Sequence, residues 1–247
     1  MVKTNEMVVR TLIESGVTRG FTLPGLGVTW SLPAFHDHKS EFDVVLCRNE
    51  WIASIMAQAA GRLEGKPSAL MGQGPWITTM GSLGILEAHF AGTPMVVLTE
   101  TSDYDGYGQM GVYQTMTGDY GGANGLASLK PITKYATYAT TPEEAVFGTQ
   151  MAVKHASLPR MGPAAVMMKT PIIRAEMSET PKPGLYPSQG YYAYTPARPD
   201  SAAVAKLAEM IDNAERPVVV AGNGVNAAQA GVQIQALAEK AGIMVTT

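Results

Sequence analysis

The sequence is poor in cysteine and in charge, and each shortage excludes a class of protein. Its 247 residues include a single cysteine, Cys47, so no internal disulfide framework can form. Charged residues make up 16% of the chain, against about 25% in an average soluble domain. The net charge of −3 provides no basic face for nucleic acid, so we expect no nucleic-acid partner.

Long apolar runs are also missing, and no segment is apolar for long enough to cross a bilayer as a helix. The opening MVKTNEMVVR lacks the apolar stretch of a signal peptide. We therefore expect no membrane partner and a cytoplasmic location. The low charge, together with 15 methionines, indicates that much of the surface is buried in contacts between subunits.

What the chain does contain is an alternation of short apolar runs and segments of helical periodicity. Strands are expected over residues 20–23, 44–47, 68–71, 95–99 and 162–169. Helices are expected over 4–15 and 78–91, after Asn49, and from Pro142 onward. Repeated units of this kind predict the α/β class, an open parallel sheet with helices on both faces.

Residues 171–199 interrupt this alternation with six prolines. Proline neither continues a helix nor fits a central strand, so an extended linker is expected there. The boundaries that follow are a first domain over 1–170 and the beginning of a second α/β domain over 200–247. Two strands and two helices cannot cover each other, so this second domain is expected to be incomplete.

One glycine motif and the histidines have ordinary structural explanations. VVVAGNGVNA, residues 218–227, has the spacing of a dinucleotide-binding loop between a strand and a helix, but no acid follows the next strand. A tight turn is the favoured interpretation, and a dinucleotide site stays open. The four histidines show no ligand spacing, so no metal ligand is predicted in this chain.

Glu50 stands where the apolar run 44–47 gives way to a helix whose cap is Asn49. An acid at this position is favoured by the helix dipole, which is explanation enough for a lone carboxylate. That helix has apolar residues at Ile52, Ile55, Met56, Ala59, Ala60 and Leu63, which predict its buried face. A catalytic role for Glu50 needs support from its surroundings.

That support comes from segments that together resemble one family in the right order. They are GVTRGFTLPG (16–25), CRNEWIASIMAQAAGRLEGKP (47–67), GQGPWITTMGSLGILEAHFAGTPMVVLTE (72–100), PITKYATYATTPEEA (131–145) and GPAAVMM (162–168). They resemble the pyrimidine-binding domain of thiamine-diphosphate enzymes of the acetolactate synthase, 2-oxo acid decarboxylase and 2-hydroxyacyl-CoA lyase group. Residues 197–225 resemble the opening of that group's central domain.

The resemblance implies a role for Glu50. It would hydrogen-bond a ring nitrogen of the cofactor's aminopyrimidine and favour the imino tautomer that activates the thiazolium carbon. Glu50 would face outward, toward a partner domain. The other implied site residues line or approach the pyrimidine, except for the last, which lies on the substrate side: Pro24, Gly25, Gly74, Pro75, Thr79 and Gln114.

The resemblance also implies cofactors and partners. Thiamine diphosphate and Mg²⁺ are expected, with FAD or a CoA nucleotide possible in the central domain. The family's metal-diphosphate signature is absent from these residues, so we expect the diphosphate-binding domain on a further segment or a separate subunit. The chain is then a fragment or one subunit of a split enzyme, within a homo- or hetero-oligomer, either a dimer or a tetramer.

The expected function is carbon–carbon bond cleavage or transfer on a small-molecule 2-oxo acid or 2-hydroxyacyl substrate, with acetolactate synthase-like condensation as the leading case. Two departures from the family pattern bear on this expectation: Trp76 replaces a glycine and Asn49 replaces a histidine. Trp76 would narrow or reshape the pocket. The alternative is a non-catalytic nucleotide-binding or regulatory subunit that retains the fold.

Overall fold

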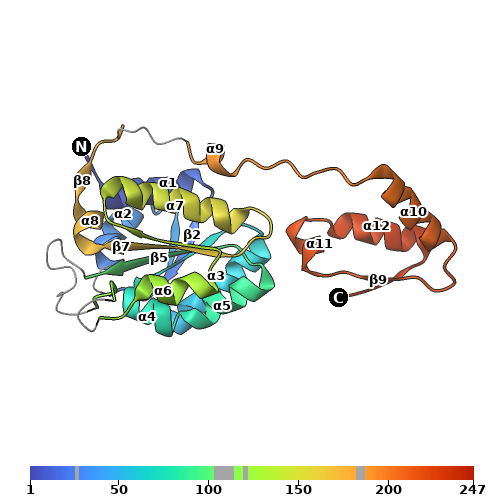
Figure 1. The fold of residues 1–247 in the computed structure, drawn as a ribbon, viewed down its shortest axis with the longest axis horizontal. Coiled ribbons are helices and arrows are strands. Elements are labelled where there is room, and N and C mark those ends of the chain that lie inside the picture. Colours follow the sequence, from blue (N-terminus) through green and yellow to red (C-terminus); the bar gives the residue numbers. More distant parts are fainter. Residues whose placement is uncertain (26–27, 103–113, 119–121, 182–186) are drawn as a thin grey trace. The chain divides into compact units, whose positions relative to one another are not determined.

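A computed structural model describes residues 1–25, 28–102, 114–118, 122–181 and 187–247, which divide into two compact units, Met1–Ala193 and Tyr194–Thr247. The first unit is built on six parallel strands in the order β3-β2-β4-β5-β7-β6 (Figure 1). Their bounds are β2 (Arg19–Thr22), β3 (Asp43–Leu46), β4 (Ser68–Gln73), β5 (Met95–Thr101), β6 (Tyr135–Ala139) and β7 (Pro163–Lys169). The predicted α/β class with an open parallel sheet is confirmed.

Helices cover both faces of this sheet (Figure 1). One face carries α1 (Thr4–Glu14), α2 (Leu32–Asp37), α7 (Pro142–Ser157) and α8 (Thr170–Arg174). The other carries α3 (Glu50–Glu64), α4 (Gly74–Thr79), α5 (Ser82–Ala91) and α6 (Gly125–Leu129). Short 3₁₀ turns are η1 (Val28–Trp30) and η3 (Lys130–Ile132).

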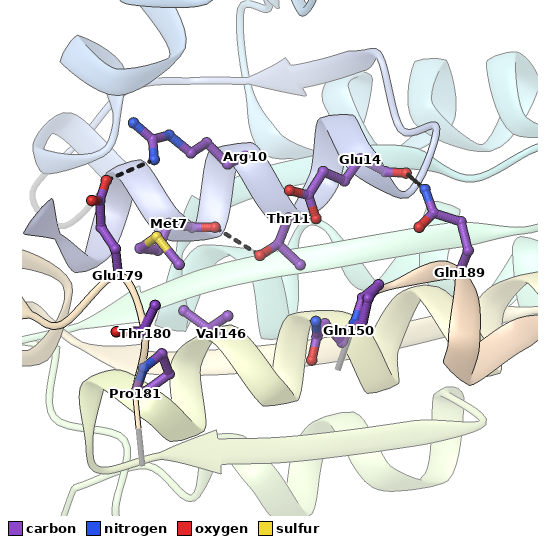
Figure 2. Close-up of a pocket in the computed structure, with 11 residues that line it drawn as sticks. Met7, Arg10, Thr11, Glu14, Val146, Gln150, Glu179, Thr180, Pro181 and Gln189 are labelled. Carbon is purple, nitrogen blue, oxygen red and sulfur yellow. Dashed lines mark hydrogen bonds and ion pairs between the residues drawn. The ribbon is translucent and has the colours of Figure 1, made fainter. Parts of the chain in front are cut away.

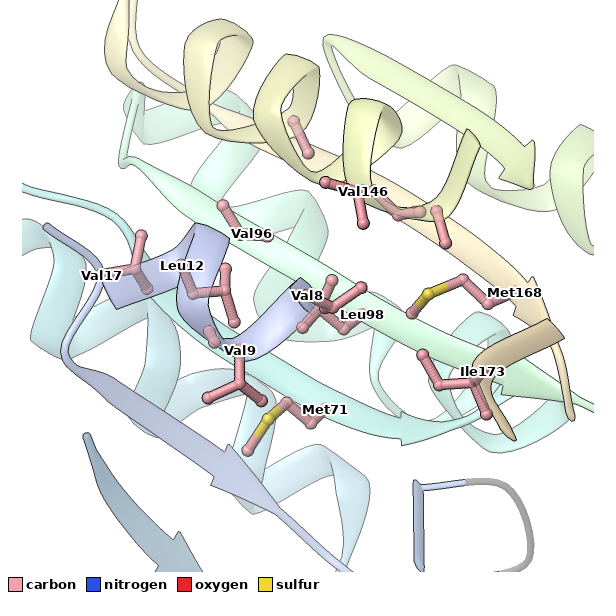
Figure 3. Close-up of a cluster of buried hydrophobic side chains, with 14 of the residues drawn as sticks. Val8, Val9, Leu12, Val17, Met71, Val96, Leu98, Val146, Met168 and Ile173 are labelled. Carbon is pink, nitrogen blue, oxygen red and sulfur yellow. The ribbon is translucent and has the colours of Figure 1, made fainter. Parts of the chain in front are cut away.

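The core on the α1 side is formed by apolar side chains from alternate strand positions (Figure 3). Val96 and Leu98 of β5 point into it, and Val97 between them belongs to the core on the other face. Both faces of the central strands are therefore buried, which is why those strands appear in the sequence as unbroken apolar runs.

Two secondary-structure expectations need correction. The helix expected over 78–91 is two helices, because Gly74-Pro75 starts α4 early and the chain turns at Met80 and Gly81 before α5. Strand β6 was not predicted; its residues are mostly half-buried at the edge of the sheet. Residues 103–113 and 119–121 lie outside the described residues; before and after them, β5 extends to Thr101 and α6 begins at Gly125.

The buried face of α3 is not the one expected. Its buried residues are Glu50, Ala53, Ser54, Ala57, Gln58 and Gly61. Ile52, Ile55, Met56 and Leu63 are exposed instead. Small side chains allow the helix to lie close to its neighbours: a Cβ on Gly61 would collide with the carbonyl oxygen of Pro94, and one on Gly84 of α5 with the Ser54 backbone.

Residues 171–193, expected as linker, contain regular structure. They include most of α8, the strand β8 (Glu176–Met177), which pairs antiparallel with β1 (Val2–Lys3), and the short helix α9 (Gln189–Tyr192). All belong to the first unit. Regular structure resumes at Ser201 in the second unit.

The second unit has two parallel strands and three helices. They are α10 (Ser201–Asp212), β9 (Val218–Val220), α11 (Asn223–Ala227), α12 (Gly231–Ala241) and β10 (Met244–Thr246). Many of its large apolar side chains are exposed, among them Val204, Leu207, Met210, Val220, Val232 and Met244. Described by itself, this unit leaves its apolar faces uncovered. No helix in the described ranges of the chain is long and apolar enough to cross a membrane.

The close contact between α3 and α5 generates a stability prediction. Gly84→Ala should lower the free energy of unfolding by about 1–3 kcal/mol, the usual cost of overpacking, because the added methyl group pushes α5 away from the Ser54 backbone. Urea denaturation followed by circular dichroism measures this. Gly190→Ala is the control, since a Cβ there meets nothing within 4 Å. Equal stabilities of the two variants would contradict the packing described.

Candidate active site

The order of the strands puts a topological switch point at the carboxyl edge of the sheet between β2 and β4, the position at which open α/β sheets form a ligand-binding crevice. From β2 the chain crosses to β3 over the face that carries α2, and it returns past β2 to β4 over the face that carries α3. In open α/β sheets, ligands bind where successive connections diverge in this way. Pro24 and Gly25 follow β2 at this point, and Gly74 and Pro75 follow β4.

The two turns are in contact. A Cβ on Gly25 would lie 2.5 Å from the Cδ and Nε2 atoms of Gln73, the last residue of β4. A side chain at position 25 would therefore displace the Gln73 side chain from its present place. Gly25 is half-buried, whereas Pro24 beside it is exposed and free to contact a ligand.

Glu50 is the first residue of α3, and the Asn49 side chain caps the helix by accepting a hydrogen bond from the Ile52 N–H at 2.8 Å. Its Cγ lies 3.6 Å from where a Cβ on Gly72 would be. Glu50 is only 5% exposed, so the expectation that it faces outward is wrong; it lies against its own sheet. No described residue donates a hydrogen bond to its carboxylate, which leaves that group available to a ligand.

Gly74 brings a third segment to the same edge. A Cβ on it would lie 3.0 Å from Cγ of Met116 and 3.3 Å from the carbonyl oxygen of Glu100. Gln114, two residues before Met116, is 9% exposed and has a φ of 65°. That left-handed backbone conformation is strained for any residue other than glycine, and such strain is concentrated at functional sites.

Thr79, the last residue of α4, is less closely involved. It is exposed, and its hydroxyl donates to the carbonyl oxygen of Pro75 at 2.7 Å within its own helix. Trp76 lies one turn earlier and is 38% exposed, on the outer surface of α4. Gly25, Glu50 and Gly74 each approach β4 or the residues directly after it, whereas the hydrogen bond of the Thr79 hydroxyl stays within α4.

Several buried polar atoms at this edge have no hydrogen-bond partner among the described residues. They are Thr22 Oγ1, Glu100 Oε2, Ser102 Oγ and Gln114 Oε1. Unsatisfied buried polar atoms are rare in folded proteins and call for a ligand, a water or a functional role. Only Gln114 among them was predicted from the sequence.

Glu100 was missed although it had a readable signal. It ends the apolar run of β5 as Glu50 follows that of β3, and it is 2% exposed. The Ser31 hydroxyl donates to its Oε1 at 2.6 Å. Burial raises the pKa of the Glu100 carboxyl to about 8, against the opposing effect of the Ser31 hydrogen bond, so Glu100 is largely protonated at neutral pH.

Pockets that are open to solvent lie elsewhere on the first unit. One, of about 650 Å³, lies between α1, α7 and the segments around Glu179 and Gln189; an Arg10–Glu179 ion pair crosses it (Figure 2). Another, of about 670 Å³, is lined by Lys3, Trp30 and Arg174 among others. None of the predicted site residues lines either cavity, and the described residues contain no group of three metal-ligating side chains.

Two family models match the chain. Residues 2–121 match the thiamine pyrophosphate enzyme N-terminal TPP binding domain, and residues 204–247 match the central domain of the same enzymes. The two matches leave 122–203 between them. They agree with the order of segments on which the resemblance in the sequence rests.

Curated relatives include an acetolactate synthase from Bacillus subtilis, 31% identical over 88% of this chain and 35% of its own length. A sulfoacetaldehyde acetyltransferase from Alcaligenes xylosoxydans xylosoxydans is 26% identical over 98% of this chain and 37% of its own. The chain thus spans little more than a third of these relatives.

Among solved structures, a thiamine diphosphate-dependent 4-hydroxybenzoylformate decarboxylase from Rhodococcus jostii RHA1 aligns with a TM-score of 0.79. The sequences are 21% identical, and the alignment covers 99% of this chain and 44% of the other. At that identity the match establishes the fold alone.

The raised pKa of Glu100 predicts a pH dependence of stability. Between 4.5 and about 8 the unfolded chain loses a proton that the folded chain keeps, so the free energy of unfolding should fall as pH rises, by up to about 1.4 kcal/mol per pH unit. Glu100→Gln removes this term. Urea denaturation across that range should show that the free energy of unfolding of Glu100→Gln increases relative to that of the wild type as pH rises. Glu64→Gln, at an exposed site, should run parallel to the wild type, and parallel behaviour of Glu100→Gln would contradict the assignment.

Proposed function

Because this chain belongs to the thiamine pyrophosphate enzyme family, we propose that it supplies the pyrimidine-binding half of an active site that acts on a 2-oxo acid or 2-hydroxyacyl substrate. The observation that carries this proposal is a buried carboxylate, Glu50, at the carboxyl edge of the sheet with no hydrogen-bond donor among the described residues. A regulatory subunit that only retained the fold would have no need of that carboxylate.

The residues present suit the pyrimidine end of thiamine diphosphate. Glycines at positions 25, 72 and 74 hold the backbone close to neighbouring side chains, so the crevice presents main-chain groups and little bulk. When bound, this cofactor supplies the carbon nucleophile that adds to a substrate carbonyl. The chain's own task is to hold the ring and its protons in place.

Glu50 would hold a proton at a ring nitrogen of the aminopyrimidine. Its position at the start of α3, with the cap supplied by Asn49, fixes the carboxylate relative to the sheet. Asn49, which replaces the histidine usual in the family, is thus accounted for as a capping residue. Pro24, Gly25, Gly74 and Pro75 would contact the faces and edges of the ring, and Thr79 would lie at the margin of the site.

Gln114 would contact the substrate. Its strained backbone and its unpartnered Oε1 atom support a role in which a ligand completes its hydrogen bonding. Several curated relatives are named acetolactate synthases, which makes condensation of 2-oxo acids the leading reaction, with decarboxylation and acyl-CoA cleavage behind it. Trp76, exposed on α4, would affect the substrate through a facing domain and not through its own pocket.

Magnesium and the diphosphate would be held by a domain on a further segment or a separate subunit, and the enzyme would be a cytoplasmic oligomer. The proposal also includes FAD or a CoA nucleotide in the central domain, for which it names no binding residue. The exposed apolar residues of one face support assembly. They are Trp51, Ile52, Ile55, Met56, Leu63, Trp76, Met80, Leu83 and Phe90, all on α3, α4 and α5 or next to them.

The catalytic role of Glu50 predicts that Glu50→Gln, in the complete enzyme, slows turnover by about 10²–10⁴-fold, the range usual for a lost acid–base group. The amide keeps the shape of the side chain but cannot share the proton. Steady-state kinetics with pyruvate as the first substrate tests it. Glu64→Gln, at the other end of the same helix, should leave turnover unchanged; near wild-type turnover in Glu50→Gln would favour the non-catalytic alternative.

The exposed apolar face predicts an effect on assembly. Leu83→Glu, at a residue of α5 that is 51% exposed, should weaken the subunit contact by about 100-fold or more, because a charge would be buried in an apolar contact. Native mass spectrometry at micromolar concentration should then show a smaller particle. Phe147→Glu is the control, since Phe147 is exposed on α7, on the opposite face. An unchanged particle mass in Leu83→Glu would refute the interface.

A further inference from the structure

The buried hydrogen bond between Ser31 and Glu100 joins segments that are 69 residues apart. Ser31 ends the turn that begins at Val28 and precedes α2, and it is 9% exposed. Glu100 lies at the carboxyl end of β5, whose side chains alternate between the two faces; like Val96 and Leu98, it points to the face that carries α2. The bond therefore ties the segment after β2 to a central strand.

The turn that contains Ser31 is connected to Gly25. The Thr29 N–H donates to the Gly25 carbonyl oxygen at 3.1 Å, and the Thr29 hydroxyl donates to the same oxygen at 2.6 Å. The Ser31 N–H in turn donates to the Val28 carbonyl oxygen at 2.9 Å. Ser31 and Gly25 thus belong to one hydrogen-bonded turn, and what holds Ser31 also holds Gly25.

The strand pair β4 and β5 provides a second contact to Gly25. Gln73 of β4 is paired in register with Glu100 of β5, and its side chain touches Gly25. Glu100 therefore reaches the Gly25 turn by two routes, one through Ser31 and Thr29 and the other through the neighbouring strand.

We propose that Glu100 is a positioning residue, which through its hydrogen bond with Ser31 holds the Pro24–Gly25 turn where it can contact the cofactor's aminopyrimidine. The proposal rests on the proposed function for the identity of the ligand, but the contact itself stands apart from it. Glu100 acts on the turn and not on the reacting atoms.

The surroundings of Glu100 favour a neutral acid in this role. Burial raises its pKa, and Ser31 is its only hydrogen-bond donor among the described residues. Charged groups on the neighbouring elements are placed elsewhere. Lys169 of β7 lies over the Tyr138 ring, Arg174 of α8 stacks on Trp30 at 4.1 Å, and His36 and Asp37 of α2 are exposed.

The test uses the complete enzyme and four variants. Ser31→Ala removes the donor, Glu100→Met removes the acceptor but keeps length and burial, and Glu100→Gln keeps a neutral acceptor. Ser68→Ala is the matched control: its hydroxyl is buried and donates to Ala57, but at the amino end of β4. Two readouts are amide hydrogen exchange of the segment 28–35 and the Kd for thiamine diphosphate in the presence of Mg²⁺.

Ser31→Ala and Glu100→Met should each accelerate exchange at the Thr29 and Ser31 amides by about 10-fold and raise the Kd by a similar factor, about 1.4 kcal/mol. Exchange in β4 and β5 should not change. Glu100→Gln should stay near the wild type in both readouts, and Ser68→Ala should change neither.

Unchanged exchange at Thr29 and Ser31 in both Ser31→Ala and Glu100→Met would overturn the proposal. So would equal acceleration in β4, β5 and segment 28–35, since that marks a general loss of stability. In another outcome, the wild type fails to bind thiamine diphosphate while hydrogen exchange in segment 28–35 changes as expected in the variants. That result would support the role of the Ser31–Glu100 hydrogen bond in holding the turn and would refute the proposed function.

Discussion

The close packing of α3 determines where the carboxylate of Glu50 lies. This helix turns its small residues inward, so that it meets the sheet and α5 at distances that exclude even a methyl group on Gly61 or Gly84. A helix held this tightly, and capped by Asn49, fixes the position of its first residue. The same packing leaves the large apolar residues of α3 on the outside, where the structure provides nothing to cover them.

Two acids at the carboxyl edge of the sheet have different proposed roles. Glu50 follows β3 and lies on the face that carries α3, whereas Glu100 ends β5 and points to the face that carries α2. In the function proposed above, a ligand at the carboxyl edge between β2 and β4 would meet Glu50 directly. The Glu100 carboxyl accepts a hydrogen bond from Ser31, and Glu100 is paired in register with Gln73, which is why we propose chemistry for the first acid and positioning for the second.

The fold was predictable where a local signal and the tertiary structure agree. Asn49 caps α3, and α7 begins at Pro142, as the sequence predicted. The buried face of α3 was not predictable, because periodicity locates an apolar stripe but cannot tell whether the protein's own core or another surface covers it. Edge strand β6 was missed for a related reason: its half-buried alternation of Tyr, Ala and Thr gives a weak signal.

The site was partly predictable for a different reason. Glu50, Gly25 and Gly74 lie in segments with family resemblance, and the strand order brings them to one edge. Glu100 and Ser31 lie 69 residues apart, and no local pattern in the sequence pairs them. The path of the chain from β2 into α2 brings Ser31 to the end of β5, where it contacts Glu100. A buried carboxyl at the end of an apolar strand therefore indicates either a ligand or a neighbouring segment that the carboxyl positions, whether or not a family motif surrounds it.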